Sequence, residues 1–133
     1  MTVNGWIIFQ QRIDGPASNV SFDVNWTDYK NGFGHLGGDY WMGNEKVHLL
    51  TTSGTWKLRM EMLFPAYGWM SAEYSYFTLD SETNNYTIHL SGYSGDCGDS
   101  MQYTGLSGMY HNGKGLPQRM SSMITVLVVI ALV

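Results

Sequence analysis

Polar and apolar residues alternate with a period of two along the middle of the chain. The clearest run begins at Trp56, where large apolar side chains occupy every second position up to Met62 and charged residues stand between them. Alternation of this kind places one face of a β-strand in a core and the other in water. Residues 71–77 and 86–90 alternate in the same way. Turn-forming residues at 65–68 and 80–85 separate the three runs, so we predict an antiparallel meander of three strands.

The first half of the chain predicts one further strand and two helices. Residues 6–12 are a run of β-forming residues that ends at a turn over 14–16. After Asn25, which can cap a helix, bulky side chains recur with helical spacing over 26–33. Asn44 is expected to cap a second short helix over 45–51. The sequence therefore predicts an α+β fold in which a central antiparallel sheet is flanked by short helices.

Length and charge restrict the kind of protein. The chain has 133 residues, which fits one domain with its own core. Seven Lys and Arg against eleven Asp and Glu give a formal net charge of −4. This acidic balance provides no electrostatic footprint for nucleic acid. The first residues lack the basic and apolar regions of a signal peptide, so we expect no signal peptide in this chain.

Three segments together carry a resemblance to a known family. They are Trp26-Thr-Asp-Tyr-Lys-Asn-Gly-Phe-Gly34, Tyr40-Trp-Met-Gly-Asn-Glu-Lys-Val-His-Leu-Leu-Thr51 and Tyr93-Ser-Gly-Asp-Cys-Gly-Asp-Ser100. In order and spacing they resemble the fibrinogen C-terminal (fibrinogen-related) domain, and the similarity runs from Gly5 to Gly113. We therefore expect residues 1–113 to form a partial, truncated fibrinogen-related domain and residues 114–133 to be an unmatched apolar tail.

The resemblance implies a secreted, extracellular binding module rather than an enzyme. Members of this family include clotting proteins, lectins of innate immunity, receptor ligands and matrix glycoproteins, so carbohydrate or protein ligands are implied. The calcium loop, the cysteine pair and the pocket aromatics that the family places after the position of Gly113 have no counterpart here. We accordingly expect no cofactor, no calcium site and a chain that is largely ligand-incompetent at the family's usual pocket.

Three asparagines stand in sequons for N-linked glycosylation: Asn19, Asn25 and Asn85. These motifs have chemical meaning only in a chain that enters the secretory route. The same Asn25 is the predicted cap of the first helix, so capping and glycan attachment compete for one side chain.

Other candidate sites in the sequence are weaker. Asp96 and Asp99 offer two oxygen ligands in a glycine-rich loop, whereas calcium needs six to eight. Turn hydrogen bonds are the alternative role for both. The only cysteine, Cys97, cannot form an internal disulfide, which leaves a free thiol, an intermolecular bridge or a small buried residue. The four histidines have no spacing typical of a metal site or catalytic triad, so no catalytic residue is predicted.

Aromatic residues are numerous between positions 67 and 76. Tyr67, Trp69, Tyr74 and Tyr76 are candidates for a surface on which a sugar ring stacks. Strict alternation places Tyr74 and Tyr76 on one face, together with Ala72. We interpret that face as the core side and expect packing rather than ligand contact.

The segment 123–133 is almost entirely apolar. As a helix it extends about 16 Å, which is too short for a membrane span. Its β-branched residues make it an aggregation hazard unless it is packed, and one interpretation is that residues after Gly113 come from a misjoined reading frame. An alternative function follows, in which the chain is a structural or homo-oligomerising fragment that acts through this tail and exposed sheet edges.

Overall fold

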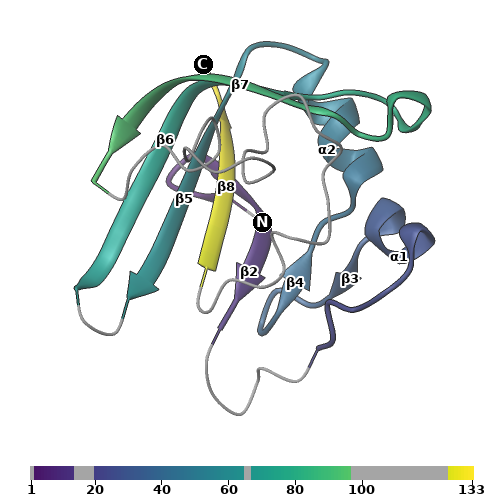
Figure 1. Cartoon of the computed structure of the whole chain (residues 1–133), viewed down its shortest axis with the longest axis horizontal. Coiled ribbons are helices and arrows are strands. Elements are labelled where there is room, and N and C mark those ends of the chain that lie inside the picture. The colour runs from purple at the N-terminus through teal and green to yellow at the C-terminus, as the bar shows by residue number, and fades with distance from the viewer. Residues whose placement is uncertain (1, 14–19, 65–66, 97–125) are drawn as a thin grey trace, which may run out of the picture.

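The computed structural model describes residues 2–13, 20–64, 67–96 and 126–133. One eight-stranded sheet dominates it, and two short helices pack beside the sheet (Figure 1). The strands follow the order β3-β4-β2-β8-β5-β6-β7, and β1 pairs with β2 outside this path. The elements are β1 (Thr2–Val3), β2 (Trp6–Arg12), α1 (Trp26–Asn31), β3 (Phe33–Gly34), β4 (Tyr40–Trp41), α2 (Asn44–Thr51), β5 (Trp56–Phe64), β6 (Gly68–Leu79), the 3₁₀ turn η1 (Glu82–Asn84), β7 (Ile88–Gly95) and β8 (Val126–Leu132). The predicted α+β class is confirmed.

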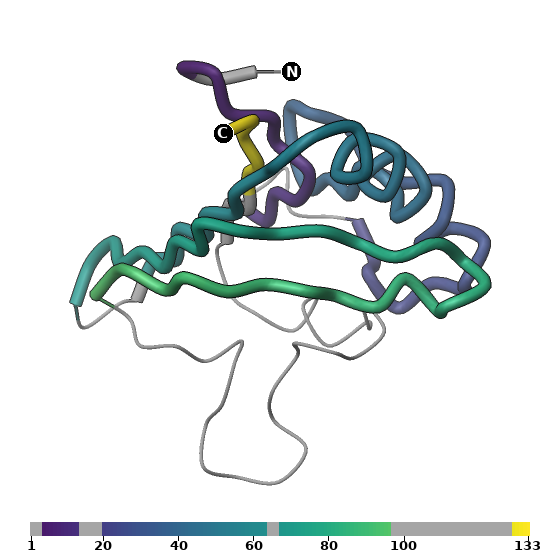
Figure 2. Tube along the Cα trace, turned by 90° about the horizontal axis from the view of Figure 1, so that it is seen from above, coloured from purple at the N-terminus to yellow at the C-terminus, as the bar shows by residue number. Residues whose placement is uncertain are grey.

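The predicted meander is present as β5, β6 and β7, which pair antiparallel in sequence order. β5 and β6 extend beyond the predicted ranges, whereas β7 begins two residues later than predicted and continues to Gly95. β6 and β7 run side by side as a long hairpin in Figure 2. The side chains of β5 alternate between a buried and a partly exposed face, as predicted. Leu58 and Met60 are completely buried, while Arg59 and Glu61 lie on the opposite, partly exposed face.

The described end of the apolar segment is a central strand of the sheet, not an exposed tail. In Figure 1 β8 lies between β2 and β5, and it pairs antiparallel with both. Ile130 stands opposite Ile7 on one side and Leu58 on the other, and it is fully buried. Val129, Ile130 and Ala131 are all buried although consecutive side chains point to opposite faces, so β8 is covered on both faces here. Burial of both faces explains why this sequence is a continuous apolar run without alternation. The sequence predicts that this segment promotes aggregation unless it is packed, and the sheet provides that packing for β8.

The two helices begin in different ways. Asn25 caps α1 as predicted, because its side-chain oxygen accepts a hydrogen bond of 2.9 Å from the backbone N–H of Asp28. The predicted cap of α2 is wrong, since this helix already begins at Asn44 and its N-cap is Gly43 at φ 112°. The Asn44 side chain instead accepts a hydrogen bond from the indole of Trp41 (3.2 Å).

The core on the helix side of the sheet is rich in aromatic rings. Phe9 stacks on Phe77 with 6.1 Å between ring centroids and meets Trp41 edge-on at 5.8 Å. Tyr29 of α1 packs edge-on against the same Trp41. Val47 of α2 is fully buried in this cluster. These contacts fix both helices to the sheet. Among the described residues, no helix has the length and apolar character that crossing a membrane requires.

Candidate functional site

Two of the three sequon asparagines lie in the described part of the protein, and Asn19 lies outside it. Asn25 is exposed and engaged as the cap of α1. Asn85 is also exposed and takes a left-handed conformation, φ 56°, directly after η1. The Asn25 side chain therefore stabilises a helix, whereas the contribution of Asn85 to the fold is its backbone conformation.

Asp96 holds the edge of the sheet. Its carboxylate accepts a hydrogen bond of 2.7 Å from the backbone N–H of Ser71, and its own N–H donates to the Ser71 carbonyl at 3.0 Å. Cys97 and Asp99 lie outside the described residues. Within the part of the protein that the structure describes, no group of three or more His, Cys, Asp and Glu side chains is placed to hold a metal ion. For Asp96 the structure thus shows a backbone-bonding role.

Two of the histidines are held by partners in their own neighbourhood. His89 on β7 lies 2.8 Å from the carboxylate of Asp80, and Nδ1 of His48 lies 2.8 Å from the carbonyl oxygen of Leu79. The first pair bridges the end of β6 and the start of β7 at the turn that joins them, and the second ties α2 to β6. Both contacts join elements of the fold to each other.

The four aromatic residues of β6 and its turn separate into different environments. Tyr74 is completely buried, as expected, but Tyr76 is 42% exposed. The prediction for Tyr76 is wrong because the pairing of β5 with β6 shifts register between Leu58↔Tyr74 and Trp56↔Phe77. Such a bulge turns one extra residue out of phase with the alternation. Tyr67 and Trp69, 79% and 59% exposed, are the most exposed of these four rings.

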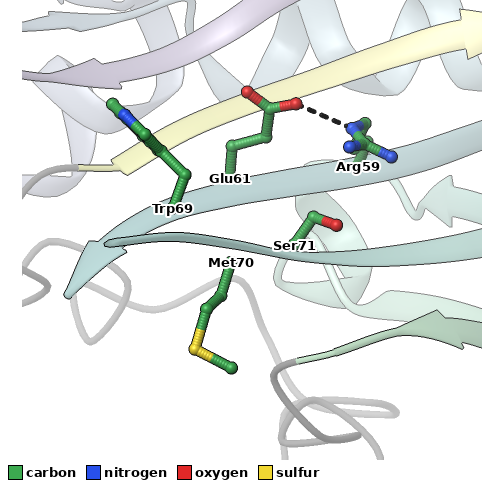
Figure 3. Close-up of a pocket in the computed structure, with 5 residues that line it drawn as sticks. All are labelled: Arg59, Glu61, Trp69, Met70 and Ser71. Atoms are coloured by element: carbon green, nitrogen blue, oxygen red, sulfur yellow. Dashed lines mark hydrogen bonds and ion pairs between the residues drawn. The ribbon is translucent and has the colours of Figure 1, made fainter. Parts of the chain in front are cut away.

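Trp69 borders a shallow hollow on the face of the sheet opposite the core. The hollow has a volume of about 120 Å³ and is lined by Arg59, Glu61, Trp69, Met70 and Ser71. In Figure 3 the side chains of Trp69 and Glu61 rise from neighbouring strands on the same side of the ribbon. The cross-strand pair Leu63↔Trp69 continues the exposed apolar surface toward the end of the hairpin. A concave polar site therefore adjoins an exposed apolar one.

A network of ion pairs fixes the polar wall of this hollow. The Arg59 guanidinium bonds Glu61 on its own strand at 2.9 Å and Glu73 on β6 at 3.1 Å, and Lys57 lies 3.8 Å from Glu73. The hydrogen bond to Glu61, reinforced by the one to Glu73, raises the pKa of Arg59. The network contains two cations and two carboxylates, so it places fixed charges beside the hollow but no net charge.

Sequence reasoning identifies Trp69 and Tyr67 as surface candidates but misses Arg59, Glu61 and Leu63. The charged residues follow the alternation of β5 and indicate only its solvent face. Leu63 carries a usable signal, because it is an apolar residue in the phase that Arg59 and Glu61 assign to water. A large apolar side chain out of phase near the end of a strand marks an exposed apolar position.

Comparison with known proteins places this protein in a family. The family described as fibrinogen beta and gamma chains, C-terminal globular domain, matches residues 1–120. Angiopoietin-related protein 1 of Bos taurus is 41% identical over 110 residues, which cover 83% of this chain and 20% of that protein. Ryncolin-4 of Cerberus rynchops is 42% identical over 98 residues, 73% of this chain and 28% of that protein. The matched region thus spans between 20% and 28% of the length of these two relatives.

Solved structures agree with the sequence matches. The fibrinogen-like globe domain of human ANGPTL2 superposes with a TM-score of 0.75 at 26% identity, over 96% of this chain and 80% of that one. Lamprey fibrin D-dimer, solved with the peptide ligand Gly-His-Arg-Pro-amide, gives a TM-score of 0.73 at 32% identity over 83% of this chain and 37% of that one. The family match, the relatives and the shared fold together show that this protein belongs to the fibrinogen C-terminal globular domain family.

Proposed function

We propose that this protein is an extracellular, non-enzymatic recognition domain that binds a protein ligand through the exposed face of the β5–β6 hairpin. We call this surface the Trp69 face and define it as Arg59, Glu61, Leu63, Tyr67 and Trp69. The observation that carries the proposal is the exposure of Trp69 and Tyr67 beside a hollow with fixed charges. Family membership supports a binding role, as does the peptide in the lamprey structure.

The residue types of the Trp69 face favour a protein as its ligand. Trp, Tyr and Arg are the residues most enriched at the energetic centres of protein interfaces. A hollow of about 120 Å³ is smaller than the roughly 300 Å³ or more of pockets that enclose a drug-sized ligand. It suits a single protruding side chain from a partner, with Leu63 and Tyr67 widening the contact around it. The neutral balance of Arg59 and Glu61 suits a partner with an apolar protrusion flanked by charges of both signs.

Binding at this face needs neither a metal ion nor a cofactor. The polar wall is made of side chains that already pair with one another. The family's calcium loop and usual pocket have no recognisable counterpart in the sequence, so we propose that the protein does not bind acetylated sugars in a calcium-dependent way. Recognition at the Trp69 face is accordingly insensitive to chelators.

Substitution of Trp69 tests the proposal. Fluorescent tetramers of the whole chain are applied to cultured cells, in calcium and in chelator, as wild type, Trp69→Ala and Leu49→Ala. Leu49 is 60% exposed on α2, so it is a matched control for loss of an exposed apolar side chain away from the Trp69 face. Loss of an anchor residue weakens binding by at least about tenfold. We expect this loss of binding for Trp69→Ala and not for Leu49→Ala. The chelator arm shows whether binding depends on calcium, and protease treatment of the cells shows whether the ligand is a protein.

The outcomes decide between ligand classes. Binding that disappears after protease treatment of the cells, and that persists in chelator, supports the proposal. Binding that disappears only after glycosidase treatment assigns the face to carbohydrate and overturns the protein ligand. A Trp69→Ala tetramer that binds as well as wild type removes the Trp69 face from recognition altogether.

The burial of Ile130 between two strands argues against assembly through the apolar segment. What remains of the oligomer prediction is pairing at the outer strands of the sheet, β3 and β7. Sedimentation of the whole chain over a range of concentrations tests it, and a concentration-independent monomer contradicts it.

A further inference from the structure

Two glycosylation sequons that are 60 positions apart meet at one corner of the molecule. The middle residue of the sequon at Asn25 is Trp26, and the middle residue of the sequon at Asn85 is Tyr86. Their rings stack with 5.7 Å between centroids and 30° between planes. The turn that joins β6 to β7 lies at the same end of the molecule as the helices in Figures 1 and 2.

Trp26 is held as an exposed platform. Its indole N–H donates a hydrogen bond of 2.9 Å to Glu82, whose second carboxylate oxygen pairs with Lys30 at 2.7 Å. Tyr86 covers one side of the ring and is itself fully buried, with its hydroxyl donated to Glu45. Trp26 nevertheless remains 44% exposed. A large apolar ring is therefore fixed in place by its neighbours while much of its surface faces water.

Asn85 stands beside this platform. It precedes Tyr86 directly, and its backbone N–H bonds the carbonyl oxygen of Glu82 at 2.8 Å, so it is adjacent to both residues that contact Trp26. Asparagine tolerates the left-handed conformation found here better than most residues, which gives Asn85 a backbone role without using its side chain. The side chain is exposed, and none of the described residues hydrogen-bonds to its amide. Among the described residues, a group attached to this side chain therefore breaks no hydrogen bond of the fold.

We propose that Asn85 carries an N-linked glycan whose first sugar ring packs on the exposed face of Trp26. The inference depends on the extracellular destination of the proposed function, because the donor is an oligosaccharyl diphosphate of the secretory route. The Asn85 amide nitrogen forms the bond to the anomeric carbon and loses one proton. The diphosphate leaves with the electrons of the broken carbon–oxygen bond, so the transfer involves no oxidation or reduction.

The platform explains what the glycan does in the folded state. The C–H face of a sugar ring is apolar, and an indole presents the large amphipathic surface against which such a face packs. Covering Trp26 removes apolar area from water at a site where the ring is already fixed, so little ordering entropy opposes the contact. The glycan is therefore expected to stabilise the domain through Trp26.

Attachment is tested by mass. The whole chain is directed into the secretory route of cultured cells by an added signal sequence, and the secreted protein is weighed before and after enzymatic glycan removal, which converts the modified Asn to Asp. We expect Asn85→Gln and Thr87→Val to lose one glycan. Thr87→Ser keeps the sequon at Asn85, and Asn25→Gln does not alter that sequon. Both variants are therefore expected to retain the glycan at position 85. Secreted wild-type protein that is unmodified at Asn85 overturns the proposal.

Packing is tested by a cycle of thermal unfolding measurements. Glycan removal is expected to lower the Tm of the wild type by about 3 °C, the change that corresponds to one modest surface contact in a domain of this size. In Trp26→Ala the same removal is expected to have no effect, since the platform is gone. An equal loss in both backgrounds refutes the contact with Trp26. Cell binding by tetramers that lack the Asn85 glycan reports on the proposed function separately, because the Trp69 face remains intact.

Discussion

Replacing Ile130 with alanine removes a side chain from the middle of β8, where it is completely buried between Ile7 on β2 and Leu58 on β5. Truncation of a buried isoleucine to alanine costs about 2–5 kcal/mol, because hydrophobic transfer energy is lost and a cavity remains. Neighbours on both sides restrict how far the site can collapse, so we expect a cost of about 3 kcal/mol. In a domain of this length that corresponds to a fall in Tm of roughly 10 °C.

Leu132→Ala is the matched control on the same strand. Leu132 is 61% exposed, so its truncation is expected to change the free energy of unfolding by no more than about 0.5 kcal/mol. Urea denaturation followed by tryptophan fluorescence measures both variants, and an unchanged m-value shows that the two-state comparison holds. Equal, small effects of the two substitutions would refute the position of β8 at the centre of the sheet.

Two further predictions concern the region around α1. The hydrogen bond from Lys30, followed by the one from Trp26, lowers the pKa of Glu82. A carboxylate with a depressed folded pKa stabilises the fold fully above its unfolded pKa of 4.5, and this contribution is lost as the pH falls through the lower folded pKa. Glu82→Gln is therefore expected to lower the Tm at pH 7 and to have a vanishing effect when the melting curves are recorded at the most acidic pH. Asn25→Ala removes the cap of α1 and is expected to cost about 1 kcal/mol in urea denaturation, whereas Asn25→Ser, which keeps a capping oxygen, costs less.

Local patterns predict those parts of the fold that depend on local chemistry. The alternation from Trp56 to Met62 assigns β5 and both of its faces, because side chains of a strand point to opposite sides whatever lies next to it. Asn25 is recognisable as a cap because the interaction is local: its side-chain oxygen accepts from the backbone N–H of Asp28, only three residues later. The Asn44 prediction fails since Gly43, at a positive φ, is the N-cap and the helix already begins at Asn44, whose side chain accepts a hydrogen bond from Trp41.

The candidate surface is predictable only in part. The sequence marks Trp69 as a possible ligand contact, but exposure of Trp69 and burial of Tyr74 depend on the register between β5 and β6. The bulge that turns Tyr76 outward has no marker in its own sequence. The stacking of Trp26 on Tyr86 likewise joins two sequons that no local pattern relates to each other.

By itself, the sequence determined the fold class, the family and the polar face of the meander, because these follow from short-range periodicity and from motifs with fixed spacing. The tertiary structure alone decided the place of the last strand. An apolar, β-branched run from residue 126 onward is equally compatible with an exposed tail and with a strand that is covered on both faces inside the sheet. The pairing of β8 with β2 and β5 distinguishes them, and it does so through hydrogen bonds to residues that lie from about 65 to more than 110 positions earlier in the sequence. Contacts over such separations leave no trace in local pattern, which is why an apparent tail is the centre of the sheet.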